Sequence, residues 1–570
     1  MTYKWNYSPL SSNEKSQIDE LAKETKLHPV LAELLVGKGI RTKKEAEEFL
    51  HPNLDNLHDP FLLPDMEAAI RRIEKALGKK ERILVYGDYD VDGTSAVSLV
   101  YKFFRKLTNN IDYYIPDRYD EGYGVSFQGI NYAIKTGVSL VITLDCGIKA
   151  ISKVAYAKEK GIDFIICDHH MPDDELPDAV AVIDAKRTDS IYPYDELSGC
   201  GVGFKLVQAF SQRNDMPFSE IEPLLDLVAV SIAADIVPLT GENRVMIYHG
   251  LKHLNLNPSY GFRGIIEICG LGRKSLTVSD IVFKIGPRIN ASGRMMNGKE
   301  AVDLMLSADM ASARQKSKNI DEYNEERREL DKKITDEAIE YIENHVDINA
   351  QKSIVLYNET WHKGIVGIVA SRLTEKYFRP TIVLTKSNEM ISGSARSVIG
   401  FDVYKAIESC RDILENFGGH TYAAGLTLRE ENLEEFTKRF QTLSFDEIEP
   451  QLMRPQINVD AEISFSAITP ELIEGLKLFA PFGPDNENPV FLTRNVVDSG
   501  SSKLVGKDLQ HIKLELKDGS THAPMQAIAF GKKEHFDKIK NGIPVDICYT
   551  IEENTYNNNS FTQLIIRDIR

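Results

Sequence analysis

The chain has 570 residues, of which 42% are hydrophobic and 27% are charged, a balance that is typical of a globular protein and excludes a disordered or fibrous one. At roughly 150 residues per folding unit, this length predicts about four domains. The 68 lysines and arginines against 85 aspartates and glutamates give a net charge of −17, so a nucleic-acid ligand would have to be held by a local basic site.

The sequence also limits where the protein acts. No run of 18 apolar residues is free of polar interruptions, and the amino end lacks the apolar segment of a secretory signal. The six cysteines are scattered without a Cys-x-x-Cys pair, which argues against a disulfide framework and a zinc knuckle. We therefore expect a cytoplasmic protein with no membrane segment.

Two patterns occupy the first 309 residues. Residues 1–79 show the helical spacing of apolar residues and predict a small helical cap. From 80 to 309, short apolar runs alternate with amphipathic segments, starting with ILVYG at Ile83–Gly87. Further strands are expected at 111–115, 140–145 and 162–167. This alternation predicts an α/β domain with a mostly parallel sheet, in which ligands bind at the carboxyl ends of the strands.

Three more regions complete the chain. No glycine lies between Gly298 and Gly364, and apolar residues recur every three or four positions, so we assign 310–348 to a long linking helix. A helix from about 310 to 346 would span about 55 Å. Strand and helix patterns alternate again over 349–450. Short strands with turn residues fill 451–570 and predict a small closed barrel of the OB type.

Three carboxylates follow the first predicted strand within five residues. DYDVDG places Asp88, Asp90 and Asp92 at the carboxyl end of ILVYG and ahead of a helix. Carboxylates this close repel one another unless cations neutralise them. A calcium EF-hand loop begins in the same way, but here the twelfth position is Leu99 in place of Glu, and a strand precedes the motif. A solvated acidic loop remains the alternative on this motif alone.

Polar residues also follow other predicted strands. Asp145 ends LVITLD, and DHH, at residues 168–170, follows IDFIIC. Asp235 lies in a mostly apolar stretch, where an unpaired carboxylate costs several kcal/mol, so we expect it to bind a cation. Carboxylates and imidazoles without thiolates suit Mn²⁺ or Mg²⁺ better than structural zinc. A carboxylate such as Asp145 could bridge two ions, one activating water and one stabilising a leaving oxygen, which predicts a metal-assisted phosphohydrolase.

A glycine-rich segment, SGCGVGFKL at 198–206, invites a dinucleotide-binding interpretation. Phe204 stands where the last glycine of that motif belongs, and no strand precedes the segment, so we exclude it.

The order of the motifs resembles that of a known group of enzymes. DYDVDG, DCG, DHH and AADIVPL are similar to the motifs of the DHH phosphoesterase superfamily. GPRINASGRM, the long linking helix, GSARS and FGGHTYAAG resemble the RecJ family within it. The resemblance runs from about residue 80 to the carboxyl end. It implies a DHH catalytic domain over 80–309, a DHH-associated substrate-binding domain over 349–450 and an OB-type barrel over 451–570.

The resemblance implies the metal ligands. Members of the superfamily hold two divalent ions, Mn²⁺ or Mg²⁺, through the motif carboxylates and the first His of DHH. The implied ligands in this sequence are Asp90, Asp92, Asp145, His169 and Asp235. The implied catalytic set is Asp145, Asp88 and His170, with His170 orienting or stabilising the phosphate. Asp88 and Asp168 also match the motifs. Each could bind a metal ion directly or could instead support the ligands from behind, and the motifs do not distinguish these two roles.

A second set of residues is typical of phosphate recognition. Ser394 and Arg396 in GSARS and His420 in FGGHTYAAG lie in loops of small residues, where a guanidinium and an imidazole can surround a phosphate. Arg118 follows the second strand and faces the same edge, although a surface salt bridge to a neighbouring aspartate would also explain it. Arg288 and Asn290 in GPRINASGR would add a basic rim to this site. The candidate substrate-binding set is therefore Arg118, Arg288, Asn290, Ser394, Arg396 and His420.

The resemblance also implies a function. We expect a metal-dependent exonuclease that removes nucleotides from the 5′ end of single-stranded DNA in repair and recombination, acting together with a helicase and a single-strand-binding protein. The 5′-to-3′ polarity rests on the resemblance alone. One alternative is a DHH phosphodiesterase that acts on short oligonucleotides or cyclic dinucleotides. Another is a non-catalytic nucleic-acid-binding scaffold.

Overall fold

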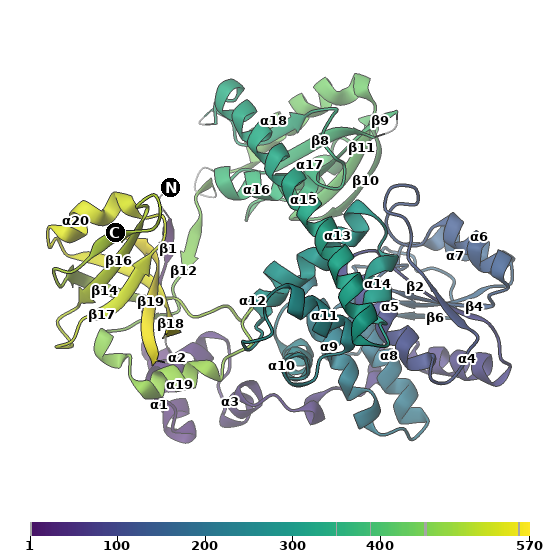
Figure 1. Ribbon diagram of the computed structural model, residues 1–570, viewed down its shortest axis with the longest axis horizontal. Helices are drawn as coiled ribbons and strands as arrows, with labels where there is room; N and C mark the ends of the chain where they lie inside the picture. The colour runs from purple at the N-terminus through teal and green to yellow at the C-terminus, as the bar shows by residue number, and fades with distance from the viewer. Residues whose placement is uncertain (1–2, 349, 388, 450–452, 557–558) are drawn as a thin grey trace. The chain divides into compact units, whose positions relative to one another are not determined.

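The computed structural model describes residues 3–348, 350–387, 389–449, 453–556 and 559–570. It divides into two compact units (Figure 1). The smaller unit comprises Met1–Asn56 and Pro455–Arg570, and the larger unit comprises Leu57–Arg454. Within the described residues, no helix is both long and apolar enough to cross a membrane.

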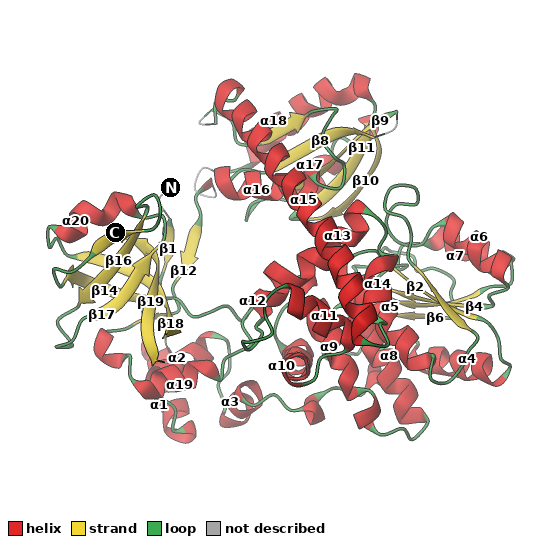
Figure 2. Ribbon diagram, viewed as in Figure 1, coloured by secondary structure: helices red, strands yellow, loops and turns green. Residues whose placement is uncertain are grey.

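The larger unit contains a five-stranded parallel sheet (Figure 2). In spatial order its strands are β3 (Ile111–Tyr114), β2 (Ile83–Gly87), β4 (Leu140–Leu144), β5 (Asp163–Cys167) and β6 (Ala181–Ile183). Every residue of β2 and β4 is buried, because helices cover both faces of the sheet. The predicted α/β fold is confirmed.

The connections of this sheet create a crevice between two neighbouring strands. β2 continues into α5 (Val91–Phe104) and then β3, whereas β4 continues into α7 (Ile151–Glu159) and then β5. These two connections run in opposite directions along the sheet, so right-handed crossovers place α5 and α7 on opposite faces. The loops that leave β2 and β4 therefore diverge, and such a point is where open α/β sheets bind ligands.

Further helices complete this part of the larger unit. They are α4 (Met66–Gly78), α6 (Phe127–Thr136), α8 (Gly199–Arg213), α9 (Leu225–Asp235), α10 (Gly241–Leu256), α11 (Tyr260–Ile268), α13 (Gly286–Met295) and α14 (Lys299–Met305). α9 packs against α5, which brings its last residue, Asp235, toward the parallel sheet.

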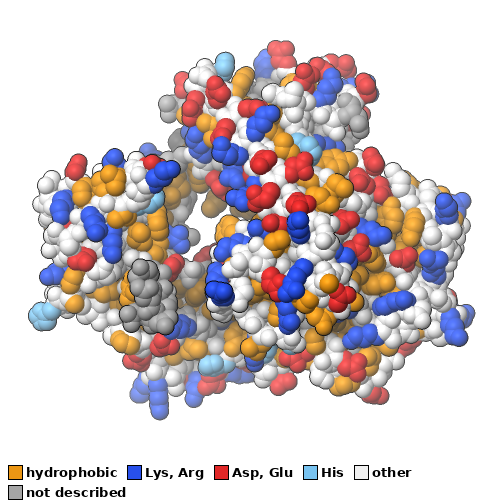
Figure 3. All heavy atoms as spheres, viewed as in Figure 1, with side chains coloured by type: hydrophobic (Ala, Val, Ile, Leu, Met, Phe, Trp, Pro, Cys, Tyr) orange, Lys and Arg blue, Asp and Glu red, His pale blue; other side chains and the backbone are white. Residues whose placement is uncertain are grey.

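One helix of 36 residues, α15 (Met310–His345), runs from this region to a second sheet. It is about 54 Å long and begins and ends close to the predicted positions. Its buried Asp331 accepts a hydrogen bond at 2.7 Å from Arg372 of α16 (Val366–Tyr377), which ties the two regions together. Exposed pairs such as Lys332 with Asp336 line its outer side, and Figure 3 shows cationic and anionic side chains intermixed there.

The second sheet has five strands of mixed direction. In spatial order they are β10 (Leu414–His420), β11 (Ala423–Leu428), β9 (Met390–Arg396), β8 (Thr381–Ser387) and β7 (Ile354–Tyr357). Only β7 and β8 pair in parallel. α16 packs on one face, and α17 (Val403–Glu408) and α18 (Leu433–Glu447) pack on the other.

The smaller unit contains a closed barrel. Its strands are β14 (Phe491–Asp498), β16 (His511–Lys517), β17 (Met525–Ala529), β18 (Val545–Tyr556) and β19 (Asn559–Ile569). The order β14, β18, β19, β17, β16 closes on itself because β16 also pairs with β14. This five-stranded barrel confirms the predicted OB-type fold.

The amino-terminal helices share the core of the barrel unit. They are α1 (Ser12–Thr25), α2 (Pro29–Gly37) and α3 (Lys43–Leu50). Leu31 of α2 lies against Gly475 of α19 (Pro470–Lys477). A Cβ added to Gly475 would stand 2.0 Å from Cδ1 of Leu31. The division of the structure therefore falls after Asn56, whereas the expected helical cap extends to residue 79. The apolar faces of these helices find their partners some 400 residues later in the sequence.

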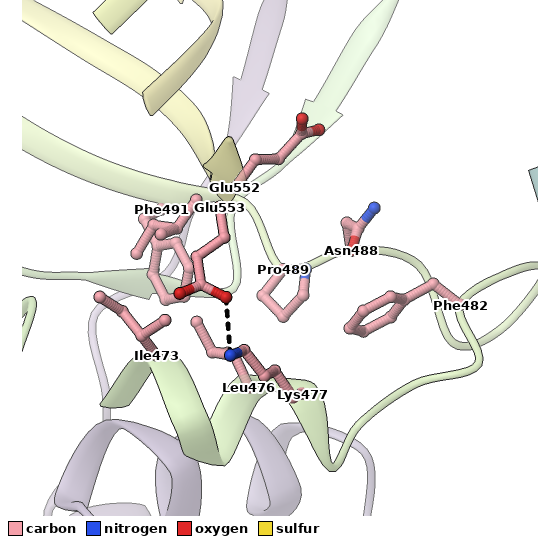
Figure 4. A pocket seen from close by; sticks show the side chains of 10 residues that line it. Ile473, Leu476, Lys477, Phe482, Asn488, Pro489, Phe491, Glu552 and Glu553 are labelled. Atoms are coloured by element: carbon pink, nitrogen blue, oxygen red, sulfur yellow. Dashed lines mark ion pairs between the residues drawn. The ribbon is translucent and has the colours of Figure 1, made fainter. Parts of the chain in front are cut away.

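A small pocket opens beside α19 (Figure 4). Phe482, Pro489 and Phe491 line it, and the ion pair between Lys477 and Glu553, at 2.6 Å, crosses its edge. Phe479, close to Phe482 in the sequence, is instead fully buried in the barrel core.

We predict that Leu31→Ala lowers the unfolding free energy of the smaller unit by about 2 to 5 kcal/mol, because Leu31 is buried in the shared core. The two tryptophans separate the units, since Trp5 belongs to the smaller and Trp361 to the larger. Denaturation followed by fluorescence should show that Leu31→Ala lowers the midpoint in a Trp361→Phe background and leaves it unchanged in a Trp5→Phe background. Equal shifts in both would contradict the assignment of these helices to the barrel.

Candidate active site

The carboxyl edge of the parallel sheet gathers the motif residues. Asp88 follows β2, Asp145 follows β4, and residues 168–170 follow β5. Asp235 reaches the same edge from the end of α9. All the side chains that the sequence places at strand ends therefore meet at the crevice between β2 and β4.

His169 lies at the centre of this group. Its Nε2 is 3.1 Å from Asp145 Oδ1, 3.6 Å from Asp235 Oδ2 and 3.8 Å from Asp92 Oδ2. The ligands of an octahedral ion with bonds of about 2.1 Å lie roughly 3 Å apart, so these spacings suit a divalent cation. Neither ring nitrogen of His169 has a hydrogen-bond partner in the described structure, although both are buried.

The electrostatics of the group also point to cations. Burial, followed by the charges of Asp92 and Asp90, raises the pKa of Asp145 well above its usual range. Burial and the same two charges also raise the pKa of Asp235 well above its usual range. Burial lowers the pKa of His169 to about 4, so its ring is neutral at neutral pH and able to ligate. A bound cation would stabilise the ionised carboxylates and so lower their pKa values. Carboxylates with an imidazole are ligands that fit Mn²⁺ or Mg²⁺.

Asp92 is anchored by the amino end of α8. Its carboxylate accepts hydrogen bonds from the amides of Gly199, at 2.7 Å, and Cys200, at 2.8 Å, and from Ser231 Oγ at 2.6 Å. These three donors use three of about four lone-pair positions, and the remaining one belongs to the oxygen nearer His169. The glycine-rich segment at 198–206 therefore holds a carboxylate, a role that its sequence pattern did not indicate.

The backbone of Asp145 is held in the left-handed region, with a φ of 59°. Its N–H donates to the carbonyl of Cys167 at 2.9 Å, and its carbonyl accepts from the Tyr123 hydroxyl at 3.1 Å. Gly199 lies so close that a Cβ there would stand 2.6 Å from Asp145 Cβ. A strained aspartate fixed from three sides is typical of a functional position.

Asp168 lies behind His170. Its Oδ1 is 2.8 Å from His170 Nδ1, and its Oδ2 accepts from the amide of Ile148 at 2.9 Å. Burial would lower the pKa of His170, but the hydrogen bond and charge of Asp168 outweigh it and raise the pKa. On its other side, His170 Nε2 lies 3.2 Å from the Tyr123 hydroxyl. The contact with His170 favours a place behind the metal site for Asp168 over direct ligation, and its role stays a prediction.

Asp88 and Asp90 close the site near β2. Asp90 caps α5, accepting from the amide of Gly93 at 3.0 Å. Asp88 is fully buried, and one of its oxygens has no hydrogen-bond partner in the described structure. Burial and the charge of Asp90 raise its pKa. Asn290 accepts from the amide of Val91 at 3.2 Å, so it supports this turn.

Three arginines gather on the other side of the same cleft. Arg118, Arg294 and Arg396 line it, and within the described part of the chain none of them pairs with a carboxylate. Arg396 donates to Ser394 and Ser371, each at 3.1 Å. Burial and the charges of Arg118 and Arg396 lower the pKa of Arg294 to about 9. Half-buried cations that repel one another are stabilised by an anion.

The cleft has a volume of about 890 Å³, within the range of ligand sites. His420 lines it, with its ring nearly parallel to that of His170 and a centroid distance of 5.9 Å. Arg118 lies over the Tyr89 ring, 4.8 Å from its centroid, in place of a salt bridge with a neighbouring aspartate. Arg288 and Asn290 are not among the described residues that line the cleft, and Arg288 pairs with Asp321 of α15 at 2.8 Å.

Known proteins resemble this chain in sequence. The chain matches the models of the DHH family N-terminal domain at 82–232, the DHHA1 domain at 350–443 and the RecJ OB domain at 459–568. It is 36% identical to the single-stranded-DNA-specific exonuclease RecJ of Bacillus subtilis, over 97% of this chain and 70% of that protein. It is 32% identical to RecJ of Salmonella typhimurium, over 97% of this chain and 98% of that protein. The chain belongs to the RecJ family.

Solved RecJ structures agree with the fold and with the kind of ion expected. RecJ from Thermus thermophilus in complex with Mn²⁺ is 25% identical, with a TM-score of 0.85 over 100% of this chain and 79% of that one. An exonuclease RecJ bound to manganese is 30% identical, with a TM-score of 0.60 over 70% of this chain and 98% of that one. The resemblance found in the motifs is thus confirmed, as is the expectation of Mn²⁺ or Mg²⁺ at a site of this kind.

We predict that Gly199→Ala weakens Mn²⁺ binding by about 10- to 100-fold, because the added Cβ displaces Asp145 and disturbs the amides that hold Asp92. Titration calorimetry with Mn²⁺ measures this directly. Gly201→Ala is the matched control, since a Cβ there meets only side-chain atoms, at 3.3 Å or more. Equal affinities in the two variants would contradict the close approach of α8 to the metal ligands.

Proposed function

We propose that this chain hydrolyses phosphodiester bonds of single-stranded DNA and releases nucleotides from the 5′ end. One observation carries the proposal: buried carboxylates with an imidazole and a cluster of arginines free of carboxylate partners, within the described residues, face one cleft. The first group suits divalent cations and the second suits a phosphate. The RecJ relatives are named as single-stranded-DNA-specific exonucleases, which supports the same substrate here.

In this proposal Asp90, Asp92, Asp145, His169 and Asp235 hold two divalent cations, Mn²⁺ or Mg²⁺. When bound, such ions neutralise the carboxylates, polarise a phosphoryl group and lower the pKa of water. Asp145 lies 3.1 Å from His169 and feels the charges of Asp92 and Asp90, so its carboxylate could contribute to holding both ions. The amides of α8 keep Asp92 oriented whether or not an ion is present.

His170 acts on the phosphate in this scheme. Asp168 holds Nδ1 of its ring, and Nε2 lies beside the hydroxyl of Tyr123, which also lines the cleft. A ring whose pKa is raised carries positive charge more readily, so it stabilises the charge that develops on the phosphoryl oxygens. In this scheme Asp88 acts from behind the ligands, where its Oδ1 accepts from the amide of Gly124 at 3.4 Å and its other oxygen is buried without a partner in the described structure.

The arginine cluster selects the end of the strand. We place a terminal 5′-phosphate among Arg118, Arg294 and Arg396, with Ser394 beside them. A guanidinium can meet a phosphate with two parallel hydrogen bonds, a geometry that lysine lacks. His420 extends the contact surface from the second sheet. Arg288 and Asn290, which the sequence placed in the binding set, are not among the described residues that line the cleft, and they bond Asp321 and the amide of Val91.

The cellular setting is part of the proposal. Repair and recombination supply single strands with free 5′ ends, and a helicase and a single-strand-binding protein are the partners that such a substrate implies. Both would act in the cytoplasm. We assign catalysis to the region from 80 to 309, substrate closure to 349–450 and strand binding to the barrel, since OB folds commonly bind single strands by stacking and backbone contacts.

We predict that Asp145→Asn abolishes hydrolysis, because the amide keeps the shape of the side chain but removes the charge shared by both ions. The substitution also tolerates the left-handed backbone at this position. Digestion of labelled single strands in Mn²⁺, with a chelator control, measures the effect. Activity above about a tenth of wild type would exclude a bridging role, and unchanged circular dichroism would show that the fold is intact.

We predict that Arg396→Ala loses about 1.5 to 3 kcal/mol of transition-state stabilisation on strands with a 5′-phosphate, the value of a hydrogen bond to a charged group. Strands with a 5′-hydroxyl should lose less. The ratio of kcat/KM for the two ends, compared between wild type and variant, isolates recognition of the terminus. Arg439→Ala is a matched control, because Arg439 of α18 pairs with Asp412 and Glu435 at the surface and is not among the described residues that line the cleft. If the ratio is the same in wild type and Arg396→Ala, Arg396 does not read the terminus.

A further inference from the structure

One loop at the cleft has no part in the proposed function. The segment EGYG lies between β3 and α6, and Gly122 and Gly124 on either side of Tyr123 both adopt a left-handed backbone, with φ of 84° and 74°. This conformation favours glycine. Two such residues around one position turn the chain sharply and present Tyr123 to the cleft, which it lines.

The loop is tied to the strand-end motifs. Gly124 accepts a hydrogen bond from the Tyr86 hydroxyl at 3.0 Å, and its amide lies 3.4 Å from Asp88 Oδ1. The Tyr123 hydroxyl donates to the carbonyl of Asp145 at 3.1 Å and lies 3.2 Å from His170 Nε2. A single tyrosine thus joins the ends of β4 and β5, while the glycine beside it joins the end of β2.

Packing does not explain this tyrosine. Tyr123 is 52% exposed, so its ring contributes little to a hydrophobic core. Its ring meets Tyr89 and His170 only edge to face, with centroids 6.3 Å and 5.8 Å apart. The position of the residue is therefore defined mainly by its hydroxyl, and that hydroxyl contacts only groups of the proposed reaction centre among the described residues.

The Tyr123 hydroxyl restricts the orientation of the His170 ring. Asp168 holds Nδ1 at 2.8 Å, but one hydrogen bond leaves the imidazole free to tilt about it. The contact of Nε2 with Tyr123 fixes the plane of the ring. The same hydroxyl holds the carbonyl of Asp145, whose backbone lies in the left-handed region.

We propose that Tyr123 is a positioning residue that sets His170 and Asp145 relative to each other through its hydroxyl. The inference rests on the proposed function, in which these two residues act on the phosphate and the cations. It assigns to Tyr123 an effect on the chemical step, because small misplacements of catalytic groups slow reactions strongly. It assigns no part in the capture of the strand.

The test compares Tyr123→Phe with wild type. We expect kcat on single-stranded DNA to fall about 10- to 100-fold while KM changes less than about threefold and the melting temperature is unchanged. Tyr156→Phe is the matched control, since its hydroxyl bonds Asn131 at 3.0 Å on the surface of α7 and α6. A fall in kcat equal to that of Tyr156→Phe overturns the proposal.

A double-mutant cycle separates positioning from a general disturbance. In a His170→Ala background, Tyr123→Phe should reduce kcat by less than about threefold, because the group that it positions is absent. The same reduction in both backgrounds overturns the coupling.

A measurement without metal or substrate keeps the inference distinct from the proposed function. In metal-free protein labelled with ¹⁵N-histidine, the signals of His170, assigned through His170→Ala, should shift in Tyr123→Phe while those of His253, which contacts Glu222 and is not among the described residues that line the cleft, stay in place. If wild type cleaves no strand but this shift occurs, the proposed function fails and the contact stands. If wild type is active and no shift occurs, the inference fails alone.

Discussion

Mutual repulsion among buried carboxylates is the constraint on which this structure depends. Asp88, Asp92 and Asp145 are almost completely buried, and Asp90 and Asp235 lie beside them. Ionised side chains at this spacing destabilise a fold unless fixed dipoles or cations offset them. The chain supplies the dipoles at the amino ends of two helices, since α5 is capped by Asp90 and α8 donates two amides to Asp92. The remaining charge is what divalent cations would neutralise.

The second charge pattern opposes the first across the cleft. Arg118, Arg294 and Arg396 repel one another as the aspartates do, and they stand within a chain of net charge −17. The net charge of the molecule therefore repels a polyanion, whereas the local group of arginines in the cleft attracts one. Such local attraction favours a flexible single strand, which can bend into a cavity, over binding along an open surface.

The sequence predicted those features that depend on local pattern. α15 was expected because its stretch contains no glycine or proline, and the strand-end acids were expected because each follows a buried run. Features set by distant contacts were not accessible. Arg288 belongs to a basic motif, yet its partner is Asp321 on a helix that only the fold brings near. Gly199 is required by its closeness to Asp145, which no local pattern encodes. Tyr123 matters through a hydroxyl, and its loop offered only a glycine pair as a signal.

The smaller unit is built from the two ends of the chain, and this affects how the protein folds during synthesis. Its helices leave the ribosome before the catalytic region, yet the barrel strands that complete their core come after it. At about 5 to 20 residues per second, the roughly 400 residues between them take about 20 to 80 s to synthesise. During that interval the apolar faces of α1, α2 and α3 are without their partners, while the catalytic region can already fold. Nascent chains of this protein therefore pass through a stage in which the catalytic region has been synthesised while the amino-terminal helices still lack the strands that cover their apolar faces.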